Sequence, residues 1–180
     1  KNPIHPELGL WIGAFERLHK AGIKQLAAIH RGFYSYEKSV FRNDPKWELP
    51  IKLRKEVRDL PIICDASHIA GKATLIEDIS QTAMDINLDG LMIETHNNPP
   101  LALSDAEQQI TPELLKNIMQ NLVLRNTKLR DEQFKEQLLN FRNKIDIFDK
   151  NIIDLLNNRK GVVEQIANFK HENRLTIFQI

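Results

Sequence analysis

The chain has 180 residues, with 25 Lys and Arg against 24 Asp and Glu, 42% hydrophobic residues and one cysteine. This composition indicates an ordinary globular protein, and nothing in it calls for nucleic acid. No apolar run approaches the ~20 residues of a membrane span, and the first residues lack the apolar core of a signal peptide. We therefore expect a cytoplasmic protein with neither a nucleic-acid nor a membrane partner and, because Cys64 is alone, no internal disulfide.

Up to about residue 125, short apolar runs alternate with helical patterns, which is typical of repeated βα units with a parallel sheet. The predicted strands cover 25–30, 60–65 and 90–96, and a weaker run at 48–52 is a fourth candidate. Each strong run ends in polar residues, as the functional strand ends of a (β/α)8 barrel do. Because a barrel needs eight strands and roughly 250 residues, we expect the C-terminal half of one. We interpret the absence of an initial methionine as a sign of a longer parent protein.

One more helix is predicted to close the barrel half. Thr111 is placed as its N-cap and Pro112 in its first turn. Leu115, Ile118 and Leu122 follow at helical spacing, so this face should pack on the core.

A change of pattern follows, which gives domain boundaries at 1–125, 126–134 and 135–180. The middle segment is polar and predicts a linker that is in part helical. Beyond it, apolar residues recur at three- and four-residue steps as far as Phe169, without a proline. This periodicity predicts one helix of about 35 residues, ~50 Å long. Such a helix cannot bury its apolar stripe alone, so partner helices from its own chain or another subunit are expected.

The ends of the predicted strands carry residue types that bind metals. His68 follows the second strand, Glu94 ends the third, and Asp105 lies in the loop beyond. One imidazole and two carboxylates suit a divalent first-row metal, although the set is one ligand short. If Leu91 and Ile93 pack on helices, strand alternation turns Glu94 into the barrel mouth. Spacing alone leaves chance occurrence of these common residues as an alternative.

Residues 1 to about 122 resemble the second half of 3-deoxy-D-arabino-heptulosonate 7-phosphate (DAHP) synthase, most closely the short bacterial type I beta. The resemblance is carried by Lys1-Asn2-Pro3, Ile29-His30-Arg31-Gly32-Phe33, Asp65-Ala66-Ser67-His68, and Gly90 to His96 followed by Ala102-Leu103-Ser104-Asp105. It implies a TIM barrel that condenses phosphoenolpyruvate with erythrose 4-phosphate in an aldol-like step of the shikimate pathway.

The same resemblance implies roles for five residues. The family holds a divalent metal with an early cysteine and then a histidine, a glutamate and an aspartate, which correspond here to His68, Glu94 and Asp105. The ion, such as Mn2+, Fe2+, Zn2+ or Co2+, would polarise the aldehyde carbonyl, and its identity stays open. Lys1 and Arg31 correspond to the cations that bind the phosphoenolpyruvate anion.

Three other residues near these motifs have narrower expectations. The family's cysteine ligand lies upstream of Lys1, so Cys64 is expected to be a buried strand residue instead. Ala66 stands where the family usually has proline, which alters loop stiffness rather than ligation. His96 is assigned either to the support of the metal shell or to packing.

The C-terminal pattern resembles the first helix of all-α chorismate mutases, including the intervals of seventeen and eleven between Arg142, Arg159 and Lys170. Arg159 and Lys170 share a helix face ~16 Å apart, whereas Arg142 lies about 25 Å from Arg159. The resemblance implies an intertwined homodimer or higher oligomer in which Arg142 reaches the partner's site. Arginines would bind the chorismate carboxylates, and Lys170 would stabilise the ether oxygen as prephenate forms. Gln179 falls where some members carry an acidic residue, which leaves its role open.

The whole-protein expectation is a bifunctional synthase and mutase. This chain alone is expected to be inactive, because half a barrel exposes two unpaired strand edges and a large apolar face. Helix cations are also commonly solvated, which leaves two alternatives for the second segment. It is then a non-catalytic sensor that binds prephenate or chorismate and regulates the barrel, or a helical dimerisation module.

Overall fold

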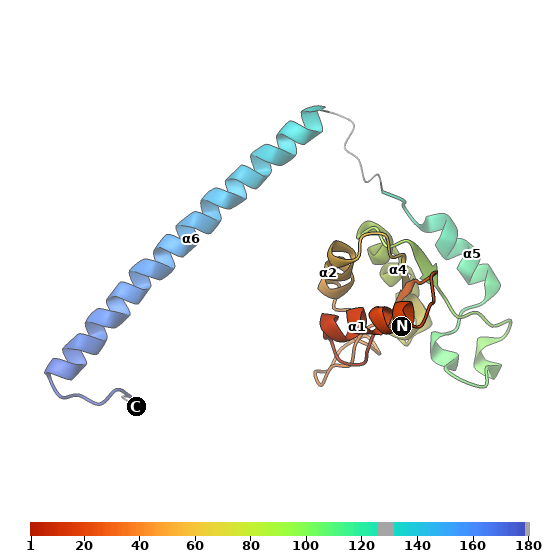
Figure 1. The fold of residues 1–180 in the computed structure, drawn as a ribbon, viewed down its shortest axis with the longest axis horizontal. Coiled ribbons are helices and arrows are strands. Elements are labelled where there is room, and N and C mark those ends of the chain that lie inside the picture. The colour runs from red at the N-terminus through yellow and green to blue at the C-terminus, as the bar shows by residue number, and fades with distance from the viewer. Residues whose placement is uncertain (126–131, 179–180) are drawn as a thin grey trace. The chain divides into compact units, whose positions relative to one another are not determined.

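The computed structural model describes residues 1–125 and 132–178, and the chain divides into two compact units, Lys1–Thr127 and Lys128–Ile180. Figure 1 shows a mixed helix and strand fold in the first unit and one long helix in the second. Each unit has its own architecture.

The first unit alternates helices and strands. Its three strands form a parallel sheet in the order β1-β2-β3, with Ile29 opposite Ile63 and Cys64 opposite Leu91. This confirms the predicted α/β class with parallel strands. In chain order the helices and strands are α1 (Leu8–Lys20), β1 (Ala28–His30), α2 (Glu48–Glu56), β2 (Ile62–Asp65), α3 (Ala66–Ala70), η1 (Ala73–Leu75), α4 (Ile76–Asp85), β3 (Gly90–Met92), η2 (Pro99–Leu101), η3 (Ala106–Gln108) and α5 (Pro112–Asn121).

Irregular segments extend both edges of this sheet. On the β1 side, the backbone N–H of Asn2 donates to the carbonyl of Ile29 at 2.9 Å. On the β3 side, the N–H of Ile110 donates to Glu94 at 3.2 Å, and His96 donates back to Ile110 at 2.9 Å. These hydrogen bonds hold Asn2 beside β1 and Ile110 beside the segment that follows β3.

The predicted fourth strand at 48–52 is wrong, because these residues open helix α2. Leu49 and Leu53, four residues apart, are both buried, which is the spacing of a helix face rather than of a strand. Pro50 lies within the first turn, where its missing N–H costs no helical hydrogen bond. The other predicted strands exist but are shorter, since β1 begins at Ala28 and β3 ends at Met92.

Helix α5 begins as predicted. The Thr111 side chain accepts a hydrogen bond from the N–H of Leu114 at 3.2 Å, and Pro112 is the first helical residue. Ile118 is buried, and Leu115 and Leu122 pack at the edge of the core. Each fully buried side chain of this size contributes roughly 1.5–3 kcal/mol.

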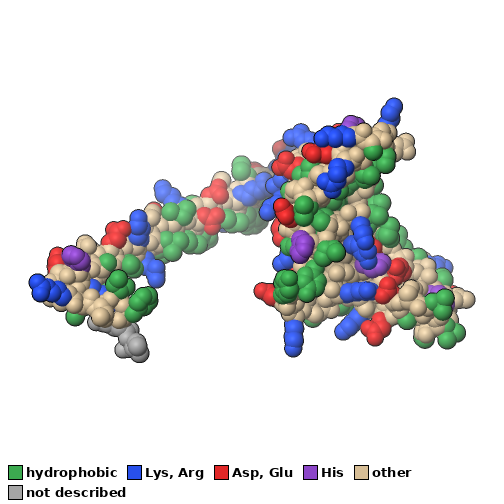
Figure 2. All heavy atoms as spheres, turned by 60° about the horizontal axis from the view of Figure 1, so that its bottom comes forward, with side chains coloured by type: hydrophobic (Ala, Val, Ile, Leu, Met, Phe, Trp, Pro, Cys, Tyr) green, Lys and Arg blue, Asp and Glu red, His purple; other side chains and the backbone are tan. Residues whose placement is uncertain are grey.

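The second unit is the single helix α6 (Glu132–Glu172), of 41 residues. It is longer than predicted because it starts inside the expected linker, whose residues 126–131 lie outside the described part of the chain. All residues of α6 are described and none is buried, and apolar side chains such as Ile152 and Phe148 are 53% and 63% exposed. Figure 2 shows hydrophobic side chains running along this helix. No helix among the described residues is long and apolar enough to cross a membrane.

Candidate metal centre

Three side chains from separate segments converge at one end of the sheet. His68 lies on α3, Glu94 follows β3 by two residues, and Asp105 directly precedes η3. One ligand atom from each lies within 4.8 Å of the others, and His68 Nε2 is 3.6 Å from Glu94 Oε1. Two ligands ~2.1 Å from one tetrahedral ion are ~3.4 Å apart, so the group needs only a small adjustment to hold a divalent metal.

Asp65 fixes the ring of His68. The carboxylate of Asp65 lies 2.8 and 2.9 Å from His68 Nδ1, and it also accepts the backbone N–H of His68 at 3.2 Å. A carboxylate only accepts hydrogen bonds, so this contact identifies Nδ1 as a donor and leaves Nε2 as the ring nitrogen that faces Glu94. This carboxylate–histidine pairing is the usual support of a metal-binding histidine.

The two carboxylates are held by neutral and cationic donors. Glu94 Oε2 accepts a hydrogen bond from Gln108 Nε2 at 2.7 Å, and Asp105 Oδ1 accepts one from Arg42 Nη1 at 2.7 Å. The hydrogen bond from Arg42 lowers the pKa of Asp105 below its usual value, so Asp105 is ionised at neutral pH. Asp105 has a φ of 50°, a left-handed conformation that aspartate tolerates better than most residues.

The turn between β2 and α3 places His68 by short-range chemistry. Asp65 is the N-cap of α3, and Gly71 ends the helix with a φ of 67°. A Cβ at Gly71 would lie 2.4 Å from Arg42 Cβ, so only glycine fits there. Asn43 Nδ2 also donates to the carbonyl of His68 at 2.7 Å, which ties the Arg42 segment to α3.

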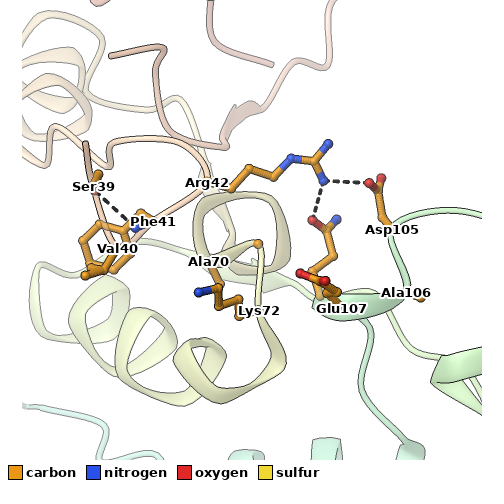
Figure 3. Close-up of a pocket in the computed structure, with 11 residues that line it drawn as sticks. Ser39, Val40, Phe41, Arg42, Ala70, Lys72, Asp105, Ala106 and Glu107 are labelled. Atoms are coloured by element: carbon orange, nitrogen blue, oxygen red, sulfur yellow. Dashed lines mark hydrogen bonds and ion pairs between the residues drawn. The ribbon is translucent and has the colours of Figure 1, made fainter. Parts of the chain in front are cut away.

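Arg42, which donates a hydrogen bond to Asp105, lines two cavities. The smaller, of about 190 Å³, also contains Lys1, Asn2 and Arg31, so it brings together the two predicted substrate-binding cations. Asn2 is buried, and its Oδ1 accepts the backbone N–H of Arg31 at 2.7 Å. The larger cavity, of about 410 Å³, includes Asp105 and Lys72 (Figure 3). The smaller cavity is thus lined by three cationic side chains, those of Lys1, Arg31 and Arg42.

The remaining residues named near the motifs lie outside the metal group. Cys64 is fully buried in β2, as expected, and burial raises the pKa of its thiol to about 12, which keeps it protonated. His96 accepts the backbone N–H of Asn98 on its Nδ1 at 2.9 Å, a local turn contact. Ala66 is buried as the first residue of α3.

The three predicted mutase cations all lie on α6. Arg142 and Arg159 are exposed, whereas Lys170 is half-buried and donates from Nζ to the carbonyl of Ile177 at 2.9 Å. A cavity of about 420 Å³ next to Lys170 is lined by Ile166, Phe169 and Leu175 among others, but not by Arg159. The described helix therefore does not assemble a complete anion site, and Gln179 lies outside the described residues.

Sequence reasoning missed three residues that support the metal group. Asp65 stood inside a recognised motif, and a carboxylate three residues before a histidine at a helix start was the available signal. No sequence signal pointed to Arg42 and Gln108. Arg42 contacts Asp105 and Gln108, which lie 63 and 66 positions further along the chain.

Comparison with known protein families gives two matches in succession. Residues 8–129 match the family model described as the DAHP synthetase I family, and residues 141–180 match that of chorismate mutase type II. The predicted order of a synthase segment followed by a mutase segment is confirmed.

Individual relatives agree with the first match. A phospho-2-dehydro-3-deoxyheptonate aldolase of Thermotoga maritima is 32% identical over 107 residues, 59% of this chain and 31% of that protein. A 2-dehydro-3-deoxyphosphooctonate aldolase of Wolinella succinogenes is 32% identical over 74 residues, 35% of this chain and 28% of that protein. The chain thus spans about a third of the length of the curated relatives it matches.

Solved structures share the fold of the first unit. The crystal structure of the Thermotoga maritima DAHP synthase superposes with a TM-score of 0.61 at 29% identity, covering 65% of this chain and 34% of that one. A truncated form of the synthase from the same organism gives 0.59 at 27% identity, covering 66% and 45%.

Proposed function

The chain belongs to the DAHP synthetase I family, and from that premise we propose that residues 1–125 contribute the metal and anion subsites of a DAHP synthase. The reaction is the condensation of phosphoenolpyruvate with erythrose 4-phosphate. The observation that carries this proposal is the convergence of His68, Glu94 and Asp105 beside a cavity lined by cations.

The donor set fits a divalent cation. A neutral imidazole and two carboxylates together carry two negative charges, and nitrogen and oxygen donors suit Mn2+, Fe2+, Co2+ or Zn2+. A metal bound there would supply Lewis-acid polarisation of the sugar aldehyde. Asp65 accepts a hydrogen bond from Nδ1 of His68, which leaves Nε2 as the ring nitrogen that would bind the ion.

The cation-lined cavity suits the phosphoenolpyruvate anion. Lys1, Arg31 and Arg42 line about 190 Å³, a volume for a compact phosphate and carboxylate rather than a nucleotide. Asn2 Oδ1 accepts the backbone N–H of Arg31 while Asn2 Nδ2 donates to the carbonyl of Gly32 at 2.7 Å, so the segment that carries Lys1 is tied to the backbone of Arg31. Fixed cations orient the anionic substrate without rearranging during the reaction.

For the C-terminal segment, the match of residues 141–180 supports chorismate mutase activity in a homo-oligomer. The exposed apolar stripe of α6 requires partner helices, which fits an assembly of several chains. Arg142 from one subunit would complete a site with Arg159 and Lys170 of another. The alternatives are a prephenate- or chorismate-binding regulatory module and a dimerisation helix.

The synthase proposal is tested by alanine substitution of the metal group in the full-length protein. His68→Ala, Glu94→Ala and Asp105→Ala should each lower the condensation rate by about 10³-fold, because loss of several kcal/mol of Lewis-acid stabilisation corresponds to about three decades. Each should also weaken divalent-metal binding. The exposed His19→Ala is the control and should change neither quantity.

The assay also decides the acceptor sugar. A seven-carbon product requires a four-carbon aldose phosphate as the acceptor of phosphoenolpyruvate, whereas an eight-carbon product requires a five-carbon one. Turnover of erythrose 4-phosphate is expected. Exclusive use of a five-carbon aldose phosphate, or full activity of any of the three variants, would contradict the proposal.

A further inference from the structure

Two side chains that are not metal ligands join the two carboxylates of the metal group. Arg42 Nη1 donates to Asp105 Oδ1 and to Gln108 Oε1, both at 2.7 Å. Gln108 Nε2 in turn donates to Glu94 Oε2 at 2.7 Å. Figure 3 shows the Arg42 side chain reaching from its own segment to Asp105.

The amide of Gln108 can take only one orientation in this chain of contacts. Its oxygen faces a guanidinium, which only donates, and its nitrogen faces a carboxylate, which only accepts. Gln108 is 1% exposed, so water cannot replace either partner without opening the site. A buried amide satisfied at both ends holds its neighbours in one arrangement, since a rotation would leave two polar groups unpaired.

The same contacts leave one oxygen of each carboxylate for an ion. Glu94 uses Oε2 for Gln108, while its Oε1 lies 3.6 Å from His68 Nε2. Asp105 uses Oδ1 for Arg42. The backbone around Glu94 is fixed separately, because its N–H donates to the buried Ser67 hydroxyl at 2.9 Å.

We propose that Arg42 and Gln108 form a positioning relay that sets the separation and orientation of the Glu94 and Asp105 carboxylates for one divalent cation. This inference rests on the proposed metal site and adds two residues that are not ligands. Such supporting contacts to metal ligands typically contribute about 10- to 100-fold in metal affinity. Gln108 is the more sensitive position, because it contacts both Arg42 and Glu94 and is buried.

The test is Mn2+ binding to the full-length protein, measured by electron paramagnetic resonance of the free ion. Gln108→Leu keeps the volume and removes both hydrogen bonds, and it should weaken Mn2+ binding by about 10- to 100-fold. Gln81→Leu is the matched control, because the Gln81 amide also joins two partners, Asp85 and the backbone of Val123, neither of which belongs to the metal group, so binding should not change. Circular dichroism establishes that each variant is folded.

A double-substitution cycle separates a relay from two independent effects. Arg42→Gln together with Gln108→Leu should weaken Mn2+ binding by clearly less than the product of the two single effects, since either substitution already breaks the connection. Multiplicative effects would overturn the relay, as would Gln108→Leu with wild-type affinity. Wild-type protein that binds no Mn2+, or binds it equally after His68→Ala, would instead refute the metal site itself.

Discussion

The two units of this chain differ in whether their side chains find packing partners within the same unit. In residues 1–125 the apolar residues of β1, β2 and the surrounding helices form a buried core, and atoms of the predicted metal ligands lie within 4.8 Å of one another. Along the whole of α6, from Glu132 to Glu172, no side chain is buried, and Arg142 and Arg159 are exposed. A site built from residues on several elements of one fold assembles locally, whereas a site on one helix needs surfaces that the helix does not supply.

This difference predicts two chemistries with separate requirements. On the proposed function, the first unit would need a divalent ion held by His68, Glu94 and Asp105. The second would need only fixed cations around a dianion, with no covalent intermediate. Substitution in one unit should therefore leave the chemistry of the other intact.

Among substitutions in the second unit, the largest effect is expected at Lys170. In the full-length protein, Lys170→Ala should lower chorismate turnover by about 10²–10³-fold, the usual cost of removing one donor to a developing negative charge. Condensation and metal binding should not change. The control is Lys160→Ala, an exposed lysine on the same helix whose partner is Glu164 at 3.6 Å.

Other outcomes for Lys170 identify the alternatives. Wild-type protein that binds chorismate without converting it, with binding lost in Lys170→Ala, would indicate a regulatory module. Neither binding nor turnover in the wild type would indicate a dimerisation helix.

A smaller effect is expected on the stability of the first unit at acid pH. His30 is fully buried among Trp11, Phe33 and Trp47, with ring centroids 5.3–6.1 Å from its own. Burial lowers the pKa of His30 from 6.5 to about 4. As the pH falls from 6.5 to 4, His30 therefore binds a proton in the unfolded chain but stays neutral in the folded chain. His30 should cost about 3 kcal/mol of stability across that window and nothing above it.

Both tryptophans contact His30, so their fluorescence follows this region during urea unfolding. His30→Phe should remove the loss between pH 6.5 and 4, while His5→Gln, at an exposed position, should keep it. An equally steep loss in His30→Phe would show that carboxylates, not His30, govern the acid stability.

Sequence reasoning succeeded where a local signal decided the structure. Thr111 and Pro112 predicted the start of α5, and short apolar runs located the three strands found among the described residues. It failed at 48–52, where Leu49 and Ile51 suggested a strand but Leu53 completed a helix face.

The start of α6 shows a second limit of local signals. The predicted linker runs to Phe134 because most of its residues are polar, yet residues 132–134 belong to the helix, and helix termini are the least certain feature of any pattern. Lys135 pairs with Glu132 one helical turn earlier, a contact that favours helix over linker at this point. The charged residues of this segment therefore belong to an exposed first turn of the helix rather than to a linker.

The residues of the candidate site also fall into those that the sequence could identify and those that it could not. His68, Glu94 and Asp105 could be named because they lie in motifs that resemble those of a known family, whereas residue type and spacing alone left chance occurrence open. Arg42 and Gln108 could not, because their role depends on a loop packing against Gly71 and on a buried amide between two segments. Long-range contacts of this kind leave no periodic signal.

The most direct test of two independent sites is removal of the metal from the full-length protein, with both reactions measured in the same sample. After chelation, condensation of phosphoenolpyruvate with erythrose 4-phosphate should stop and return when Mn2+ is added, while chorismate rearrangement continues at its original rate. Loss of the chorismate reaction on chelation, in protein that circular dichroism shows to be folded, would contradict the independence of the two units.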